Sequence, residues 1–200
     1  MERKGLDISS YQKGINFDEI KSKVDFLILR AGFTGWGGDG TNKNKDSCFE
    51  DFYSKSKARG IPIGAYWYSC ANTYEKGKAE AEYLYNNCLK GKQFEYPIYM
   101  DVEEDRHQQV GKARIADAIK GFCEYLENKG YYVGIYANSN YFNNFIDTAK
   151  LSMYDKWLAV WTSNKPSFKY GDYGLWQNSS SGYISGMRVD TDYAYKDYPS

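Results

Sequence analysis

Short apolar segments alternate with amphipathic segments along most of the chain, and this alternation limits the folds that are open to it. Apolar runs such as "DFLILRAG" and "IPIGAYWYS" predict buried strands. Between such runs, apolar residues recur at helical spacing, as in "ARIADAIKGFCEYLENKG". We expect strands at residues 4–9, 25–32, 61–69, 96–103 and 131–139, and helices at residues 17–24, 46–59, 74–90, 112–129 and 140–145.

The pattern changes after this point, because three further strands follow with no helix-length gap between them. They are expected at residues 156–163, 173–179 and 187–195. Repeated strand–helix units imply right-handed crossovers and a parallel sheet, and eight strands are the number that closes a barrel. The sequence therefore predicts an α/β fold: an irregular TIM-like barrel of five βα units followed by three β-strands. We expect one domain over residues 1–200, and a monomer.

Composition excludes several classes of partner. Acidic and basic side chains balance at 26 each, so no basic excess favours a nucleic-acid partner. No apolar stretch is long enough to insert stably in a membrane, and "MERKGLDISS" has no signal-peptide pattern. The 21 tyrosines are unusual. Such density fits a cleft that stacks on sugar rings, and it fits a β-rich core equally well.

Few residue types in this chain can do chemistry. His107 is the only histidine, so zinc sites built on several histidines are unavailable and we expect no metal or other cofactor. The segment "GWGGDG" at residues 35–40 matches no phosphate-binding motif and predicts a flexible loop. The four cysteines are widely spaced without a CxxC pair, which favours buried reduced thiols over disulfides. Carboxylates are the chemistry that remains.

Four of those carboxylates belong to predicted strands: Asp7 ends the first, Asp101 and Glu103 end the fourth, and Asp190 lies in the last. In a barrel they would converge at the C-terminal mouth, the face that carries catalysis in such folds. Asp101 and Glu103 are two residues apart, so they share one side of the strand, while Val102 faces the outer packing layer. Taken singly, each acid could instead form a turn or a solvated edge. Glu104 and Asp105 are expected on the surface.

The sequence resembles the glycoside hydrolase family 25 lysozymes, which are muramidases of phage endolysins and bacterial autolysins. The resemblance rests on ordered motifs that cover nearly the whole chain: "KGLDISSYQKGINF", "FLILRAGFTG", "IPIGAYWYS", "YPIYMDVE", "GYYVGIYANSNYF", "WLAVWTS", "YGLWQNSSSG" and "GMRVDTDYAY". It implies the barrel fold predicted above. It also implies bacteriolytic hydrolysis of the β-1,4 bond between N-acetylmuramic acid and N-acetylglucosamine in bacterial peptidoglycan.

The same resemblance assigns roles to the acids. Glu103 is expected to be the acid/base, and Asp101, remaining ionised, to orient or stabilise the N-acetyl group of the substrate. Asp7 and Asp190 would tune the charge of the site and hold water or substrate. The chain departs from the family pattern at Asp192, where Asn is usual, and also at Trp67 and Asn178. These departures bear on substrate contacts or on packing.

Several side chains near strand ends are candidates for contacts to the sugar. We expect substrate binding by Tyr66, Tyr68, Tyr136, Trp161 and Asp192. Packing inside the barrel is an equal alternative for the aromatic residues, and the stereochemical outcome stays open. Two other functions remain as alternatives: a chitinase-like glycosidase and a sugar-binding barrel without catalysis. The absence of a signal pattern favours synthesis in the host cytoplasm and release at lysis, with secretion or wall association as the alternative. Whether a wall-binding domain follows Ser200 is not decided.

Overall fold

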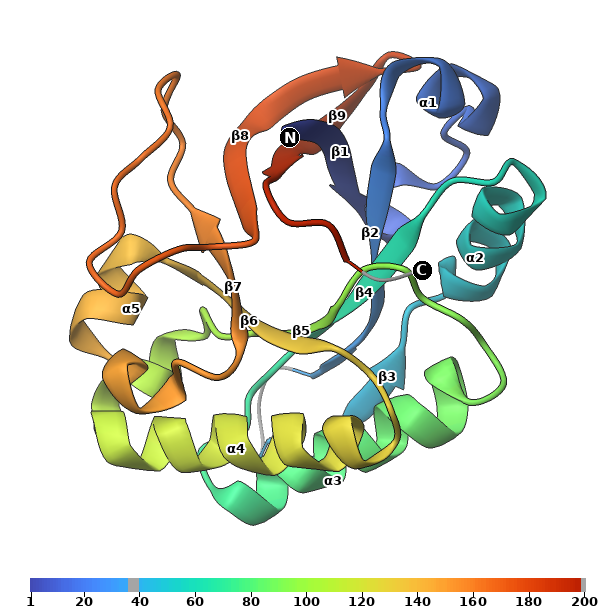
Figure 1. Cartoon of the computed structure of the whole chain (residues 1–200). Helices are drawn as coiled ribbons and strands as arrows, with labels where there is room; N and C mark the ends of the chain where they lie inside the picture. Colours follow the sequence, from blue (N-terminus) through green and yellow to red (C-terminus); the bar gives the residue numbers. More distant parts are fainter. Residues whose placement is uncertain (36–39, 199–200) are drawn as a thin grey trace.

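Eight strands close into a barrel within the described part of the chain, residues 1–35 and 40–198 of the computed structural model (Figure 1). In chain order the elements are β1 (Arg3–Ile8), α1 (Phe17–Lys23), β2 (Phe26–Thr34), β3 (Lys43–Lys45), α2 (Phe49–Ala58), β4 (Ile63–Tyr68), α3 (Tyr74–Leu84), β5 (Ile98–Asp101), α4 (Lys112–Asn128), β6 (Val133–Asn138), α5 (Ser139–Asn144), β7 (Asp155–Ala159), β8 (Leu175–Ile184) and β9 (Met187–Ala194). Short 3-10 turns lie at Ser10–Gln12, Asp105–Gln109 and Thr148–Leu151, and a π-helical turn lies at Tyr85–Leu89.

The barrel closes because β1 pairs on both sides. It lies parallel to β2 and antiparallel to β9. Within the ring, neighbouring strands from β1 round to β8 are parallel, and β9 is antiparallel to both of its neighbours. The short β3 lies outside the ring, on the edge of β2. The expected α/β barrel is therefore confirmed, with β3 as a strand that the sequence did not predict.

Other boundaries differ from expectation for local reasons. The strand expected at residues 96–103 is only Ile98–Asp101, so Glu103 follows the strand rather than ending it. The helix expected at residues 74–90 ends in the π-helical turn. Strand β8 continues through the serine-rich stretch to Ile184 because it pairs with β9 as a hairpin. Residues 36–39 of the loop expected at residues 35–40 lie outside the described residues.

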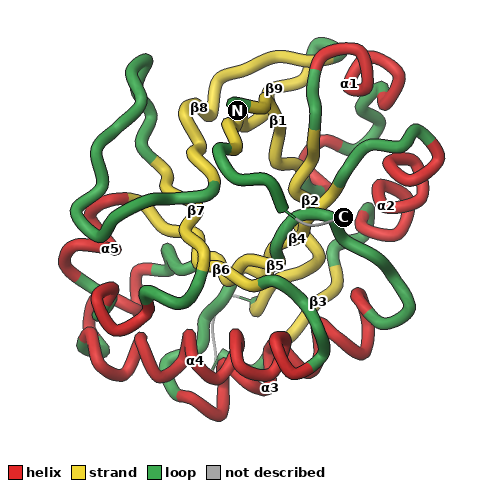
Figure 2. Tube along the Cα trace, in the orientation of Figure 1, coloured by secondary structure: helices red, strands yellow, loops and turns green. Residues whose placement is uncertain are grey.

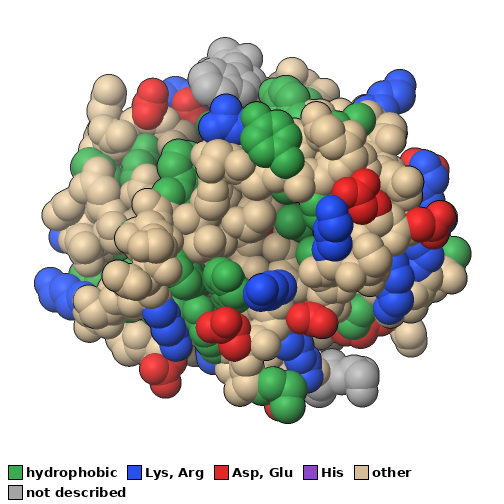
Figure 3. Space-filling model, turned by 90° about the horizontal axis from the view of Figure 1, so that it is seen from above, with side chains coloured by type: hydrophobic (Ala, Val, Ile, Leu, Met, Phe, Trp, Pro, Cys, Tyr) green, Lys and Arg blue, Asp and Glu red, His purple; other side chains and the backbone are tan. Residues whose placement is uncertain are grey.

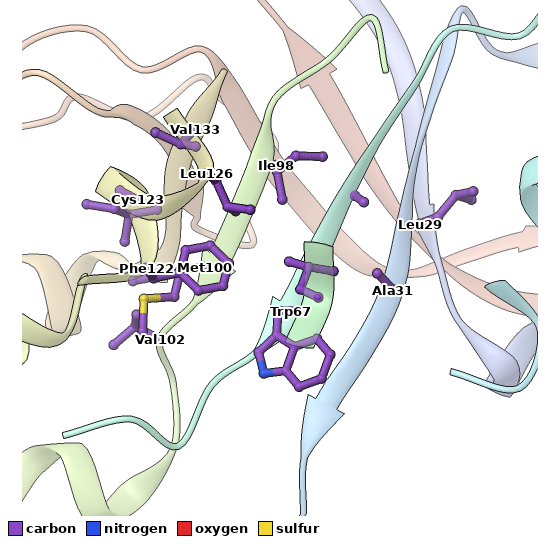
Figure 4. Close-up of a cluster of buried hydrophobic side chains, with 14 of the residues drawn as sticks. Leu29, Ala31, Trp67, Ile98, Met100, Val102, Phe122, Cys123, Leu126 and Val133 are labelled. Carbon is purple, nitrogen blue, oxygen red and sulfur yellow. The ribbon is translucent and has the colours of Figure 1, made fainter. Parts of the chain in front are cut away.

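Alternation along each strand builds two separate apolar layers. Phe26 and Ile28 of β2 face the barrel interior, where they join Tyr99 and Trp157 in one cluster. Leu27 and Leu29 belong to a second, larger cluster that includes side chains of the helices. Figure 4 shows Met100 and Val102 beside Phe122 and Leu126 of α4 in this outer layer. The expected outward direction of Val102 is confirmed, and the opposite side of the strand carries Asp101.

Helices α3 and α4 lie side by side at one end of the view, and the tube in Figure 2 shows the same arrangement. Two glycines permit the close approach. A Cβ atom on Gly77 would lie 1.9 Å from the carbonyl oxygen of Ala118, and one on Gly121 would lie 2.1 Å from that of Tyr74. Any side chain at these positions would push the two helices apart.

Three further features concern the cysteines, the surface charges and the character of the helices. All four cysteines are buried and free, as expected. On the face drawn in Figure 3, side chains of both charges are interspersed. Within the described residues, none of the helices has the length and apolar character needed to cross a membrane.

Candidate active site

The four carboxylates expected to converge do line one cavity at the barrel mouth. Asp7 lies in β1 beside Asp190 of β9, and Asp101 is the last residue of β5. Together with Glu103 they border a cavity of about 470 Å³. A smaller space of about 60 Å³ lies among the same four acids and is also lined by Tyr66, Tyr136, Trp157 and Gln177. The geometric part of the prediction is therefore met, although the chemical roles of the acids stay predictions.

Asp101 and Glu103 form a coupled pair with raised pKa values. Asp101 is 4% exposed, whereas Glu103 opens to the cavity. Burial raises the pKa of Asp101 well above its ordinary value, and Glu103 raises it further through repulsion and a hydrogen bond. Burial among the cavity walls also raises the pKa of Glu103, while its hydrogen bond with Asp101 opposes that rise. A carboxyl pair in such contact retains one proton, because both groups cannot ionise cheaply.

Asp101 was expected to remain ionised beside a protonated Glu103. Burial raises the pKa values of both carboxyls, so the position of the proton within the pair stays a prediction.

A second group of carboxyls lies across the cavity. Burial raises the pKa of Asp7 well above its usual range, and the charges of Asp192 and Asp190 raise it further. Gln177 Nε2 donates a 2.8 Å hydrogen bond to Asp7 Oδ2, and Gln177 Oε1 accepts one of 2.7 Å from the Tyr136 hydroxyl. Gln177 therefore connects Asp7 to Tyr136 through two hydrogen bonds.

Asp192 lies beneath the cavity rather than along it. It is 2% exposed, and its Oδ1 accepts a 2.8 Å hydrogen bond from Trp157 Nε1. Burial raises the pKa of Asp192 to about 7. It is not among the residues that border either space at the mouth, so the structure favours an action through Asp7 over the expected contact with substrate.

The aromatic candidates divide by location. Tyr66 and Tyr68 border the larger cavity, and Tyr136 borders the smaller one. Trp161 follows β7, which ends at Ala159 rather than at residue 163. It is 64% exposed, and its Nε1 donates a 3.1 Å hydrogen bond to Gln177 Oε1. Trp161 is thus linked to the site, although it borders neither space.

The expectation that Glu104 lies on the surface is wrong. Glu104 is 7% exposed and accepts hydrogen bonds from the backbone N–H of Arg106 at 3.0 Å and from its Nε at 2.9 Å. It caps the 3-10 turn that contains His107, which is itself buried with Nε2 at 3.0 Å from the Ala71 carbonyl oxygen. Asp105 is exposed as expected.

Sequence reasoning missed several residues of the cavity. Arg30, Tyr11 and Phe33 border its outer part, and Gln177 and Trp157 lie at its base. Period-two alternation in "FLILRAG" points Arg30 to the same side as the interior residues Phe26 and Ile28, and this signal could have found it. No local signal singles out Gln177.

Two departures from the family pattern lie away from the cavity. Trp67 is fully buried in the outer layer, where its Nε1 donates to Thr34 Oγ1 at 3.1 Å. Asn178 Oδ1 accepts a 2.8 Å hydrogen bond from Thr191 Oγ1. Both side chains therefore have roles in packing or hydrogen bonding outside the four-acid site.

Comparison with known proteins gives a consistent result. An autolytic lysozyme of Clostridium acetobutylicum is 29% identical over 192 residues, which cover 94% of this chain and 54% of that protein. Lysozyme M1 of Streptomyces globisporus is 25% identical, with 94% of this chain and 65% of that protein covered. The chain thus spans between about half and two thirds of the length of these curated relatives.

Solved structures support the fold. The spore cortex lytic enzyme SleM of Clostridium perfringens matches with a TM-score of 0.84 at 20% identity, covering 97% of this chain and 67% of the other. The sequence model of the glycosyl hydrolases family 25 matches residues 6–187. With most of its length matched, this chain belongs to glycosyl hydrolase family 25.

Proposed function

We propose that the chain is an N-acetylmuramidase that hydrolyses the β-1,4 bond between N-acetylmuramic acid and N-acetylglucosamine in bacterial peptidoglycan. The observation that carries the proposal is the pair of Asp101 and Glu103, which borders one cavity at the barrel mouth together with Asp7 and Asp190. Glycoside cleavage needs a proton donor for the leaving oxygen and negative charge near an oxocarbenium-like transition state, and such a pair can supply both. The two relatives described as lysozymes support the same assignment.

Glu103 is the proposed general acid and base. It opens to the cavity, where a glycosidic oxygen can reach it, whereas Asp101 is enclosed. When a sugar fills the cavity, an amide N–H of its N-acetyl group would donate to Asp101 and favour the ionised form. The shared proton would then be on Glu103, which is the state needed to protonate the leaving oxygen.

Asp101 is proposed to orient the N-acetyl group for attack on the anomeric carbon. Inverting enzymes separate their two carboxyl groups by about 6.5–9.5 Å, and ordinary retaining enzymes by about 5–5.5 Å. Asp101 is buried beside Glu103 rather than across the cavity from it, so it is not the proposed nucleophile or the proposed base of either arrangement. This favours assistance by the substrate itself, with retention of configuration.

Other parts of the assignment follow the same reasoning. Tyr66, Tyr68, Tyr136 and Trp161 are proposed to contact sugar through ring faces and hydroxyl or indole groups. Asp7 and Asp190 are proposed to hold water or substrate opposite the pair. The chain is proposed to act as one catalytic domain on the wall, without metal or cofactor, after release from the cytoplasm of a lysing host. Export from the cell is the alternative route.

Replacement of Glu103 tests the proposed function. Glu103→Gln keeps the shape and removes the transferable proton, so turbidity loss of purified peptidoglycan should slow by ~10²–10⁴-fold. The thermal melting temperature should stay level or rise slightly, because the repulsion within the pair is relieved. Asp105→Asn is the matched control, since Asp105 is exposed two residues further on. Near-normal hydrolysis by Glu103→Gln would mean that another group is the acid.

The sugar released at the reducing end separates this activity from its alternatives. A muramidase releases N-acetylmuramic acid at the new reducing end, whereas cleavage of the alternate bond releases N-acetylglucosamine. Binding of peptidoglycan without new reducing ends would instead indicate a sugar-binding barrel without catalysis.

A further inference from the structure

Arg30 is the single basic side chain among the described residues that border the larger cavity. It lies in β2 opposite Tyr66 of β4, with its side chain directed to the barrel mouth. The register of β2 against β4 shifts between Arg30 and Gly32. A bulge of this kind inserts one extra residue, so that Phe33, three residues after Arg30, borders the same cavity.

The guanidinium of Arg30 is held in a fixed orientation. Its Nε donates to Asp46 Oδ2 at 2.8 Å, and its Nη2 donates to Ser10 Oγ at 3.0 Å. Asp46 is itself fixed, because its Oδ1 accepts a 2.8 Å hydrogen bond from the backbone N–H of Cys48. Nε and Nη2 therefore already donate to protein groups, and within the described residues no hydrogen bond donated by Nη1 is found.

Aromatic rings cover the same guanidinium. The ring centres of Tyr11 and Phe33 lie 5.2 Å and 4.9 Å from its central carbon. Tyr11 is 82% exposed, so its ring stands at the rim of the cavity with little support except Arg30. A cation held in place beside two aromatic rings is a suitable receptor for a planar anion, since guanidinium groups bind carboxylates through directed hydrogen bonds.

We propose that Arg30 is a specificity-determining residue that binds a carboxylate of the glycan, so that the cavity prefers strands carrying N-acetylmuramic acid over neutral N-acetylglucosamine oligomers. The inference rests on the proposed function, because it names the feature by which that site would choose its substrate. Without Arg30, the charged side chains that border the cavity among the described residues would all be carboxyls, namely those of Asp7, Asp101, Glu103 and Asp190.

The carboxylate can come from two places in peptidoglycan. Where the peptide stem has been removed, the lactyl ether of N-acetylmuramic acid ends in a free carboxylate. Where the stem is present, that group is an amide and the stem supplies carboxylates of its own. The chemistry at Arg30 is the same in both cases, so the two sources are separated by experiment.

The test measures binding to the whole chain carrying Glu103→Gln, with and without Arg30→Gln. Three soluble probes of equal sugar length are compared by calorimetry: an N-acetylglucosamine oligomer, a stem-free peptidoglycan strand and a stem-bearing strand. Arg30→Gln should weaken binding of an acidic strand by ~10-fold or more and leave the neutral oligomer within about twofold. A loss with the stem-free strand identifies the lactyl carboxylate, and a loss confined to the stem-bearing strand identifies the stem.

Controls separate recognition from folding. Arg30→Gln leaves Asp46 buried without its cation, so Arg30→Gln with Asp46→Asn replaces the ion pair by two amides and should show the same selective loss. Arg30→Lys keeps the charge and should recover part of the preference, which should also weaken with added salt. Equal loss of affinity for all three probes, or no loss for either acidic strand, would overturn the inference. Wall hydrolysis by the unmodified chain reports separately on the proposed function.

Discussion

Asp101 and Glu103 are similar acids that lie at different depths in the barrel mouth. The enclosed Asp101 has its Oδ1 without a hydrogen-bond partner within the described residues, which is a costly site for a negative charge. Glu103 opens to the cavity, where water can support its ionised form. A substrate that supplies a donor to Asp101 would favour its ionised form and leave the proton on Glu103, so substrate binding would also activate the acid.

The pH dependence of hydrolysis should report this pair. Activity requires one proton on the two carboxyls, so kcat/KM should fall at low pH, when both are protonated, and at high pH, when both are ionised. Asp101→Asn leaves a single carboxyl. The maximal rate should drop and the acid-side fall should disappear, as measured by turbidity loss across the pH range. A variant that keeps the acid-side fall unchanged would assign that limb to Asp7 or Asp190 instead.

For individual residues, the sequence predicted the acids of the motif but not the side chains that contact them. Asp101 and Glu103 could be predicted because the motif follows a buried strand. Glu104 could not, because its burial comes from capping the 3-10 turn after β5 and from its contacts with Arg106. Gln177 could not be predicted either, since its role arises from contacts with Asp7 and Tyr136, which are distant in sequence.

At the level of secondary structure, pairing between strands decides strand ends and register shifts that local sequence patterns do not predict. The stretch "QNSSSGYI" has little strand propensity, yet it continues β8 because β9 supplies a hydrogen-bonding partner. Its hairpin turns at Ser185 and Gly186, whose φ angles of 55° and 72° suit a tight two-residue connection. The shift of register after Arg30 has the same origin, because a bulge depends on how two strands pair and cannot be predicted from the sequence of one strand.

Helix contacts also override local propensity. Gly121 lies inside α4, where alanine would be favoured by about 1 kcal/mol. Gly121→Ala should nevertheless lower the free energy of unfolding by about 1–3 kcal/mol, because the new methyl would meet the Tyr74 carbonyl and separate α3 from α4. Chemical denaturation measures the change. Asp117→Ala on the exposed side of the same helix is the control and should be near neutral. A stabilised Gly121→Ala protein would contradict the close packing of the two helices.

For the molecule as a whole, the number of strands predicted the barrel. Closing the barrel brings several carboxyl groups together at its mouth. Closing the ring brings β1, β5 and β9 together, so that carboxyls separated by most of the sequence share one enclosed volume. Glu80 adds another buried carboxyl outside the mouth, where burial raises its pKa to about 7 despite hydrogen bonds from Thr34 and Ser69. Composition could not reveal this, because the total charge is balanced.

These buried acids should make the protein more stable in mild acid than at neutral or alkaline pH. Burial raises the pKa values of Asp7, Asp101, Glu103 and Asp190, and it raises those of Glu80 and Asp192 to about 7. Between the ordinary carboxyl range near pH ~4 and about pH 7, the folded state therefore binds more protons than the unfolded chain, and the free energy of unfolding falls as pH rises. His107 opposes this trend because burial lowers its pKa, and Lys156 opposes it at alkaline pH because burial lowers its pKa to about 8, but the buried carboxyls outnumber these two groups.

Melting temperatures measured by calorimetry at about pH 5 and about pH 8 should accordingly differ, with the lower value at about pH 8. Each 1 kcal/mol of lost stability should lower the melting temperature by roughly 2–4 °C in a chain of this size. Asp192→Asn is the matched variant, because an amide can keep the hydrogen bond from Trp157 while removing one buried titration. It should fold and show a shallower decline between the two pH values than the unmodified protein. A melting temperature that rises from mild acid to about pH 8 would contradict the predicted effect of the buried acids as a group. A decline that Asp192→Asn leaves unchanged would show that Asp192 does not titrate in the folded barrel as its burial implies.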